Sequence, residues 1–266
     1  MTDPGVEAPF AASFTPDFAG ADVCPSPNFG ERRGGGRPDA LILHYTGMET
    51  GDGAQAWLCD PRSEVSSHYL VHEDGRVVQM VREADRAWHA GRGSWRGVDD
   101  VNSFSIGIEI VNPGHFLGFT EFPKPQIAAV IALGNDICRR HAIPPERVLA
   151  HSDITPGRKI DPGEKFPWEA LAAAGLGHLV APAPITPGRI LGPGDGGPAV
   201  AALQRMLALY GYGVEETGLY DEATRIVVQE FQRHFRRARV DGLADLSSCE
   251  TLRRLLDTLG SFDRAT

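Results

Sequence analysis

The sequence has little cysteine, no long apolar run and no excess of basic residues. Its four cysteines are scattered and never form C-x-x-C, which excludes a zinc ribbon and a dense disulfide framework. No apolar stretch approaches the roughly 20 residues that a helix needs to span a bilayer. Acidic residues outnumber basic ones and give a formal net charge of -9, so the chain offers no basic surface to phosphates or anionic lipids. We therefore expect neither a membrane span nor a nucleic-acid partner.

Glycine and proline, by contrast, are plentiful in one segment. Residues 177–197 are dominated by glycine, proline and alanine and show neither helical nor strand periodicity. This composition favours an extended, semi-rigid connector. We predict an N-terminal domain over residues 1–176, a linker over 177–197 and a C-terminal domain over 198–266, and we expect the two domains to fold separately.

The N-terminal domain combines strand patterns with a few helical ones. Asp74-Gly75 separates two strand-like runs and is a strong signal for a two-residue hairpin turn. Pro125 suits the first turn of a helix, and the apolar residues that follow it recur at helical spacing. Strands are predicted over residues 41–46, 68–73, 76–81 and 105–112, and a helix over 126–141. This pattern predicts an α/β domain in which helices cover a mixed β-sheet.

The C-terminal domain has helical periodicity throughout. Three apolar stripes predict three helices, of which Gly211 ends the first and Asp221 caps the second. Ser247 opens the third, and Glu250 follows three residues later, the spacing of a capping box. We therefore predict a small all-α domain of three helices.

Three stretches place metal-binding residue types among apolar neighbours. They are His44 in LHYTG, Glu109 in GIEIVN, and His151 with Asp161 in HSDITPGRKIDPG. Taken singly, each residue has an ordinary structural explanation, such as a hydrogen-bonded core histidine or a solvent-facing glutamate. Taken together, two histidines and an aspartate supply the N, N and O donors of a catalytic zinc site with one open position. A further carboxylate outside the metal shell is what a zinc hydrolase needs as general base.

These motifs also resemble those of a known family. LHYTG, AWHAG at residues 87–91, SIGIEIVN and HSDITPGRKIDPG are similar to the type 2 N-acetylmuramoyl-L-alanine amidases, the AmpD/AmiD group. The resemblance covers about Ser26 to Trp168 and extends to the related peptidoglycan recognition proteins. It implies hydrolysis of the amide between N-acetylmuramic acid and the first L-alanine of the stem peptide, in peptidoglycan or in muropeptides.

The resemblance assigns roles residue by residue. It implies one zinc ion per chain, held by His44, His151 and Asp161. Glu109 would be the catalytic base that takes a proton from water. Lys159, two residues before Asp161, would stabilise the oxyanion as a fixed positive charge.

Five further residues are expected to line the substrate groove. His68 and His89 match histidines in the family pattern. Trp88 and Trp95 are suited to stacking on sugar rings, with filling of the core as the alternative. Asn112 follows Glu109 by three residues, so its face depends on where the strand ends.

The C-terminal domain resembles the three-helix peptidoglycan-binding domain of cell-wall hydrolases. The resemblance rests on ALQRMLALYGYGV, TGLYDEATRIVVQEFQRHF and VDGLADLSSCETLRRLL. It implies that the domain tethers the enzyme to wall polymer, and the alternative is a bundle used for packing or dimerisation. Two other functions remain open: a non-catalytic peptidoglycan-binding protein, and a zinc peptidase that cuts within the stem peptide. The full set of predicted ligands and acid–base residues argues against the first, and the spacing in HSDITPGRKIDPG argues against the second.

The expected location rests on two conflicting features. The chain begins Met1-Thr2-Asp3-Pro4 and lacks the basic start and apolar core of a secretory signal, which favours the cytoplasm. A wall-binding domain favours the periplasm or the cell wall instead. Cys24 and Cys59 could pair only if the compartment is oxidising.

Overall fold

Apolar runs of the N-terminal part form a six-stranded sheet in the order β1-β5-β4-β7-β3-β8. The structure is a computed structural model that describes residues 13–262, so the start at Met1 to Pro4 lies outside the described residues. Strands β4, β7, β3 and β8 are mutually parallel, whereas β5 and β1 run the opposite way. The strands are β1 (Ala21–Val23), β3 (Ala40–Tyr45), β4 (Tyr69–Val71), β5 (Val77–Gln79), β7 (Ser105–Ile110) and β8 (Val148–Ala150).

Helices and a small second sheet complete this α/β part. β2 (Phe29–Gly30) pairs antiparallel with β6 (Arg86–Ala87) away from the main sheet. The helices of this part are α1 (Gly51–Leu58), α2 (Val101–Phe104), α3 (Lys124–His141), α4 (His151–Ile154) and α5 (Trp168–Ala173). The predicted mixed sheet covered by helices is confirmed, and so are the hairpin at Asp74-Gly75, which joins β4 to β5, and the long helix. Among the described residues, no helix is both long and apolar enough to cross a membrane.

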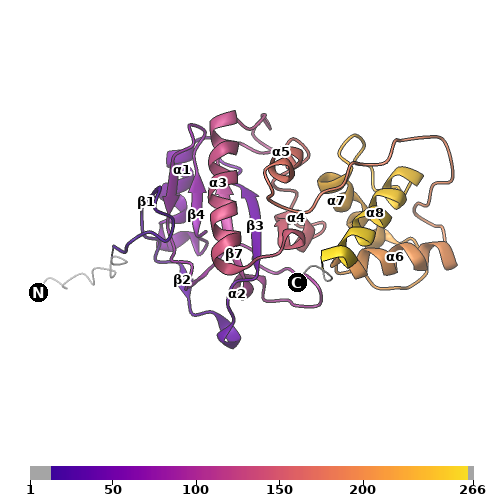
Figure 1. Cartoon of the computed structure of the whole chain (residues 1–266), viewed down its shortest axis with the longest axis horizontal. Helices are drawn as coiled ribbons and strands as arrows, with labels where there is room; N and C mark the ends of the chain where they lie inside the picture. The colour runs from indigo at the N-terminus through magenta and orange to yellow at the C-terminus, as the bar shows by residue number, and fades with distance from the viewer. Residues whose placement is uncertain (1–12, 263–266) are drawn as a thin grey trace, which may run out of the picture.

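Side chains of β3 point alternately to two different cores. Leu41 and Leu43 pack with Val130 and Ile137 of α3 on one face of the sheet. Ala40 and Ile42 point to the other face, because successive side chains of a strand alternate. The core on that side contains further apolar residues of the α/β part and continues into the C-terminal helices, which lie beside α4 and α5 (Figure 1).

The C-terminal part consists of α6 (Pro198–Tyr210), α7 (Glu222–Phe235) and α8 (Leu246–Phe262). Gly211 follows α6, and the Asp221 side chain caps α7 by accepting a hydrogen bond from the Thr224 N–H at 2.8 Å, both as predicted. The predicted cap of the third helix is wrong. Asp245 accepts from the Ser248 N–H at 2.8 Å, whereas the Ser247 hydroxyl donates to the Ala183 carbonyl. An aspartate two positions earlier offers the stronger, charged acceptor.

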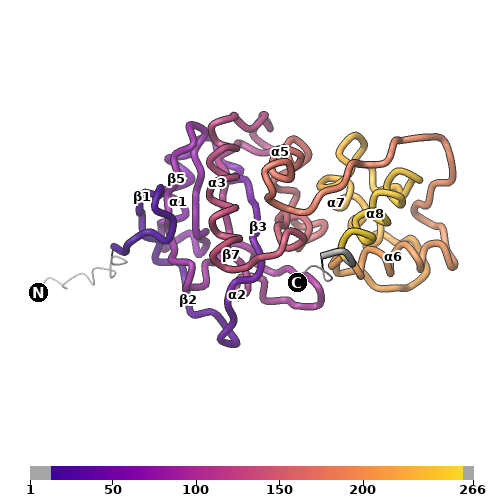
Figure 2. Tube along the Cα trace, in the orientation of Figure 1, coloured from indigo at the N-terminus to yellow at the C-terminus, as the bar shows by residue number. Residues whose placement is uncertain are grey.

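The connector between the two parts is extended, and it forms hydrogen bonds with the helical part. Figure 2 follows it from α5 along the helical part to the start of α6. Ala183 donates its N–H to Thr251 Oγ1 at 3.0 Å, and Leu191 pairs with Ala244 in an isolated bridge. The predicted residue boundaries and the separate folding of the two domains both remain predictions, but the two parts are in contact in the structure. One core contains Ala40 and Ile42 together with apolar side chains of α6, α7 and α8.

Candidate active site

The predicted site residues lie at the carboxyl ends of neighbouring parallel strands. His44 and Glu109 are direct register partners on β3 and β7. β8 lies on the other side of β3, and His151 follows it immediately as the first residue of α4. Asp161 comes from the loop after α4, where its carbonyl accepts a hydrogen bond from the Ser152 N–H at 3.0 Å. Parallel strands open their carboxyl ends on the same edge, which is the usual place for a site in such sheets.

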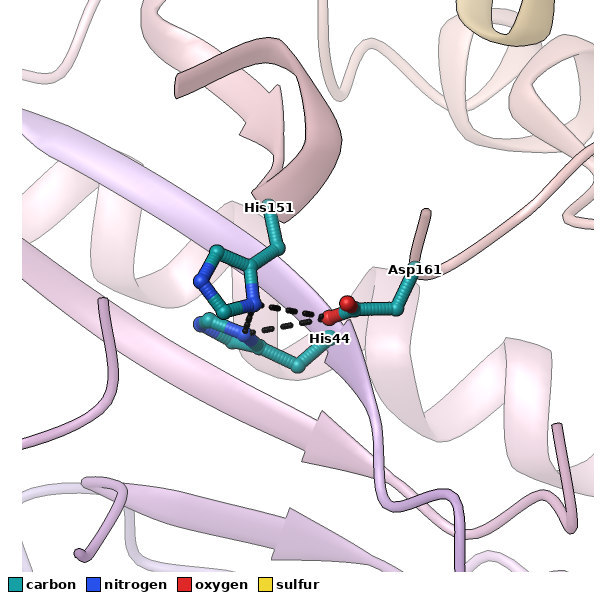
Figure 3. A group of neighbouring side chains, drawn as sticks. All are labelled: His44, His151 and Asp161. Atoms are coloured by element: carbon teal, nitrogen blue, oxygen red, sulfur yellow. Dashed lines mark hydrogen bonds and ion pairs between the residues drawn. The ribbon is translucent and has the colours of Figure 1, made fainter. Parts of the chain in front are cut away.

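Three potential metal-donor atoms lie close together at this edge of the sheet. Nδ1 of His44 and Nδ1 of His151 are 2.9 Å apart, and Asp161 Oδ2 lies 3.3 Å from the first and 3.0 Å from the second (Figure 3). The three residues are 1–5% exposed. Ligands at about 2.0–2.1 Å from a tetrahedral zinc ion are separated by roughly 3.3 Å from one another. The donor set and its spacing therefore fit a zinc ion.

Neighbouring groups set the tautomers of both histidines. Nε2 of His151 lies 3.2 Å from the Ala90 carbonyl oxygen, which can only accept, so Nε2 carries the hydrogen. Nε2 of His44 lies 3.0 Å from Nδ1 of His89. The Ser105 hydroxyl donates to the Val101 carbonyl and therefore accepts from Nε2 of His89. Nδ1 of His89 therefore accepts, and Nε2 of His44 carries the hydrogen. Burial, and then the charge of His151, lower the pKa of His44 to about 4. Both Nδ1 atoms can therefore present a lone pair to a metal ion. The contacts at the two Nε2 atoms hold the rings in place, as is usual for metal-binding histidines.

Asp161 is the anionic member of the group. Burial alone would raise the pKa of its carboxyl group, but the adjacent rings of His151 and His44 hold that pKa well below its usual value. The carboxylate is therefore ionised at neutral pH, and it supplies a negative charge to a cation.

Glu109 has a different environment. Its Oε2 is shielded from solvent and forms no hydrogen bond with any described residue. Burial, together with the charge of Asp161, raises the pKa of Glu109 well above its ordinary value. A buried, unpartnered carboxylate oxygen beside three convergent donors has a raised proton affinity, which suits a general base.

A pocket of about 580 Å³ opens above these residues. Lys159 lies at its solvent-exposed side, and Trp88 is half-buried in its wall. Its lining also includes Tyr45, Met48, Trp57, Val65, His89, Glu109, Phe116, His151, Arg158, Ile160 and Asp161. The cavity is thus lined by two of the predicted ligands, the predicted base and Lys159, while His44 contacts both of these ligands without lining it.

Three of the expected groove residues lie elsewhere. His68 is 0% exposed, and its Nδ1 accepts a hydrogen bond from the Gly107 N–H beneath the pocket. Trp95 is 0% exposed and packs on Tyr212 of the helical part, so it fills the core. The Asn112 side chain accepts from the Gly114 N–H and donates to the Thr120 carbonyl, which shapes the following loop. These expectations are corrected, because sequence motifs do not show on which side of a backbone a side chain lies.

His89 has a mixed position. It is 8% exposed and contributes to the pocket lining, as expected. Its two ring nitrogens, however, contact His44 and the Ser105 hydroxyl at 3.0 and 3.2 Å. Its principal contacts therefore fix the His44 ring.

Several pocket residues were not predicted from the sequence. Arg158 donates to the carbonyls of Ala90 and Arg92 and closes one wall. Phe116 is 91% exposed and Trp57 is 45% exposed at the rim. The position of Arg158 inside HSDITPGRKIDPG was an available signal, whereas the two aromatic residues carry none in their local sequence.

Comparisons with known families match both parts of the chain. Residues 34–164 match the N-acetylmuramoyl-L-alanine amidase family. Residues 196–255 match a family of peptidoglycan binding domains. The first match contains all of the convergent donors and Glu109, and the second contains most of the helical part.

Individual relatives and solved structures agree with these matches. The chain is 38% identical over 246 residues to the N-acetylmuramoyl-L-alanine amidase AmiD of Escherichia coli, covering 84% of each chain. A structure of AmiD from E. coli with the substrate anhydro-N-acetylmuramic acid-L-Ala-D-γ-Glu-L-Lys has a TM-score of 0.72 at 35% identity, covering 88% of this chain and 98% of that one. A structure of AmpDH3 from Pseudomonas aeruginosa with anhydromuramic pentapeptide has a TM-score of 0.68 at 29% identity, covering 89% and 96%.

Proposed function

This chain belongs to the N-acetylmuramoyl-L-alanine amidase family and hydrolyses the amide between N-acetylmuramic acid and L-alanine, and we propose that it does so with a zinc ion held by His44, His151 and Asp161. The observation that carries the proposal is the convergence of three donor atoms beside the unpartnered Oε2 of Glu109.

The donor set supports zinc over other common cations. Two imidazole nitrogens and one carboxylate oxygen form a mixed set, whereas calcium and magnesium prefer oxygen ligands throughout. Three protein ligands leave the fourth tetrahedral position for water or substrate. Zinc bound there would polarise the amide carbonyl and make water more acidic.

The residues of the chain supply the proton transfers and the charge balance. Glu109 accepts the proton that water loses as its oxygen attacks the amide carbon, and then passes it to the alanine nitrogen as the C–N bond breaks. The Lys159 ammonium group balances the negative charge that develops on the carbonyl oxygen. The raised pKa of Glu109 favours both uptake and temporary retention of the proton.

Muropeptides are the substrates that the relatives support. The related structures of AmiD and AmpDH3 contain anhydromuramic peptides as bound molecules. We propose that the pocket of this chain accepts the same class, and that the match to peptidoglycan binding domains extends its use to wall polymer.

Product analysis tests the proposed reaction. Incubation with a purified anhydromuropeptide should release an intact stem peptide with a free L-alanine amino terminus and an intact anhydro sugar, identified by mass spectrometry. Intact sacculi, digested in parallel, show whether polymer is also a substrate. Shortened stem peptides would identify a peptidase, and no cleavage of either substrate would contradict the proposal.

Replacement of Lys159 tests the charge assigned to it. Lys159→Ala should lower kcat on the order of 10²-fold, the effect of removing one oxyanion-stabilising group. KM should change little, because the interaction forms mainly in the transition state. Lys124→Ala, which removes an exposed lysine at the start of α3 and outside the pocket, is the matched control. A loss confined to KM would instead make Lys159 an anchor for a substrate carboxylate.

A further inference from the structure

Two residues of the helical part form hydrogen bonds with one buried carboxylate of the α/β part. Tyr212 donates its hydroxyl hydrogen to Asp153 Oδ1 at 2.6 Å, and His234 Nδ1 donates to Asp153 Oδ2 at 2.7 Å. Asp153 is 0% exposed, Tyr212 2% and His234 4%. A buried carboxylate that loses such a donor is destabilised, because water cannot reach it to replace the lost hydrogen bond. The two parts of the chain are therefore joined through a polar contact that excludes solvent.

Both donors are held in place by aromatic side chains of the α/β part. The His234 ring stacks on Trp168, with ring centroids 3.7 Å apart. The Tyr212 ring meets Trp95 edge-on, with centroids 5.1 Å apart. Trp95 and Trp168 are 0% and 3% exposed. Tyr212 and His234 therefore have little freedom to turn away from Asp153.

Asp153 lies in the element that carries a predicted metal ligand. α4 is a single turn whose first residue is His151. Asp153 Oδ2 also accepts a hydrogen bond from the Ala150 N–H at 2.8 Å, directly before His151. The carboxylate thus connects the helical part to the backbone that sets the direction of the His151 side chain. A shift of Asp153 would tilt the turn and move Nδ1 of His151 away from the other donors.

A second connection reaches the pocket wall from α7. Arg233 donates to Glu164 Oε2 at 2.6 Å, and Nε2 of His115 lies 3.1 Å from the same oxygen. Nδ1 of His115 lies 3.1 Å from the hydroxyl oxygen of Tyr45, which lines the pocket. The helical part is therefore connected to the site by two separate chains of contacts, one through Asp153 to His151 and one through Glu164 and His115 to Tyr45.

We propose that the C-terminal helical part belongs to the catalytic apparatus, with Tyr212 and His234 as positioning residues that fix His151 through Asp153. The inference rests on the proposed function only in taking His151 as a metal ligand. It goes beyond tethering, because a tether raises the local concentration of the enzyme at polymer and leaves the metal site unchanged.

Tyr212→Phe in the full chain tests the inference, because it removes one hydrogen bond and keeps the ring. We expect the zinc dissociation constant to rise about tenfold. This is the lower end of the effect, about 10–100-fold, of replacing residues that hydrogen-bond to metal ligands. The visible absorption of the cobalt-loaded protein should shift, and kcat should fall with KM nearly unchanged. Chelator competition, cobalt spectroscopy and kinetics on a muropeptide measure these effects.

Tyr220→Phe is the matched control. Tyr220 is a second buried tyrosine of the helical part, and its hydroxyl donates to the Gly242 carbonyl at 2.8 Å within that part. This variant should lose a similar amount of thermal stability but keep the zinc affinity and the cobalt spectrum of the unmodified protein. If both variants have the same zinc affinity and cobalt spectrum, the interface only stabilises the fold and the inference is wrong. Failure of the unmodified protein to bind either metal would overturn the proposed metal site itself.

His234 provides an independent pair of variants. His234→Leu removes the donor to Asp153, whereas His234→Asn can place an amide N–H near the position of Nδ1. We expect the leucine variant to bind zinc more weakly and the asparagine variant to recover part of the loss. Unchanged zinc affinity in His234→Leu would contradict the inference even if Tyr212→Phe failed to fold.

Discussion

Glu109→Gln is expected to lower kcat by a factor on the order of 10²–10⁴, the contribution of a positioned general base. The amide has the shape of the carboxylate but cannot accept the proton that water loses. Zinc content should remain at one ion per chain, because Glu109 lies outside the predicted ligand set of His44, His151 and Asp161. Kinetics on an anhydromuropeptide, together with metal analysis of the same sample, measure both quantities.

Replacement of a buried glutamate outside the pocket is the control that distinguishes loss of catalysis from damage to the fold. Glu83 is 3% exposed and bonds to Tyr69, Arg140 and His141, and it does not line the pocket. Glu83→Gln should therefore lower thermal stability while the folded protein keeps its kcat. If Glu109→Gln lost its zinc as well as its activity, Glu109 would have to be counted among the ligands.

His151→Ala is expected to lose both zinc and activity. The histidine supplies one of three donor atoms, and its replacement leaves too few ligands for a stable site. The loss of zinc affinity should exceed the effect of about 10–100-fold that follows replacement of a residue that only hydrogen-bonds to a metal ligand. Metal analysis after dialysis and kinetics on a muropeptide check the expectation.

A different buried histidine serves as the control for this variant. His72 is 5% exposed and contacts Gln55 and Arg76 rather than the donor group. His72→Ala should keep its zinc and most of its activity. Full activity of His151→Ala, or of metal-free unmodified protein, would exclude the metal-dependent reaction.

The core of the site could be predicted from the sequence because its residues lie in or next to short apolar strands. His44 and Glu109 come within runs that form β3 and β7, and His151 directly follows the run that forms β8. Such runs form adjacent buried strands, so polar residues at their ends are brought together. The predicted strands, the long helix and the three C-terminal helices are confirmed as well, because the spacing of apolar residues along the sequence identifies such elements.

The surroundings of the site could not be predicted in the same way. Trp95 suits either a sugar or a core, and only the three-dimensional packing against Tyr212 decides between them. His68 matches a family motif, but its burial beneath the pocket follows from pairing between strands distant in sequence. Contacts over long sequence separations leave no local pattern.

The contact between the two parts is the feature of the fold that the sequence indicates least. Prolines and glycines in 177–197 predict an extended connector, and the connector is extended. Composition cannot show, however, that Ala183 and Leu191 are buried or that Ile42 belongs to a core shared with the C-terminal helices. Both faces of β3 are apolar, and the core on one of them continues from the α/β part into the helical part.

Hydrolysis in oxygen-18 water tests the central claim most directly. Attack of water on the carbonyl between N-acetylmuramic acid and L-alanine must place the new oxygen in the lactyl carboxyl group of the sugar product. We therefore expect one oxygen-18 atom in the released sugar and none in the released stem peptide when an anhydromuropeptide is the substrate. Oxygen-18 in a peptide carboxyl group, or no incorporation into the sugar, would contradict the account.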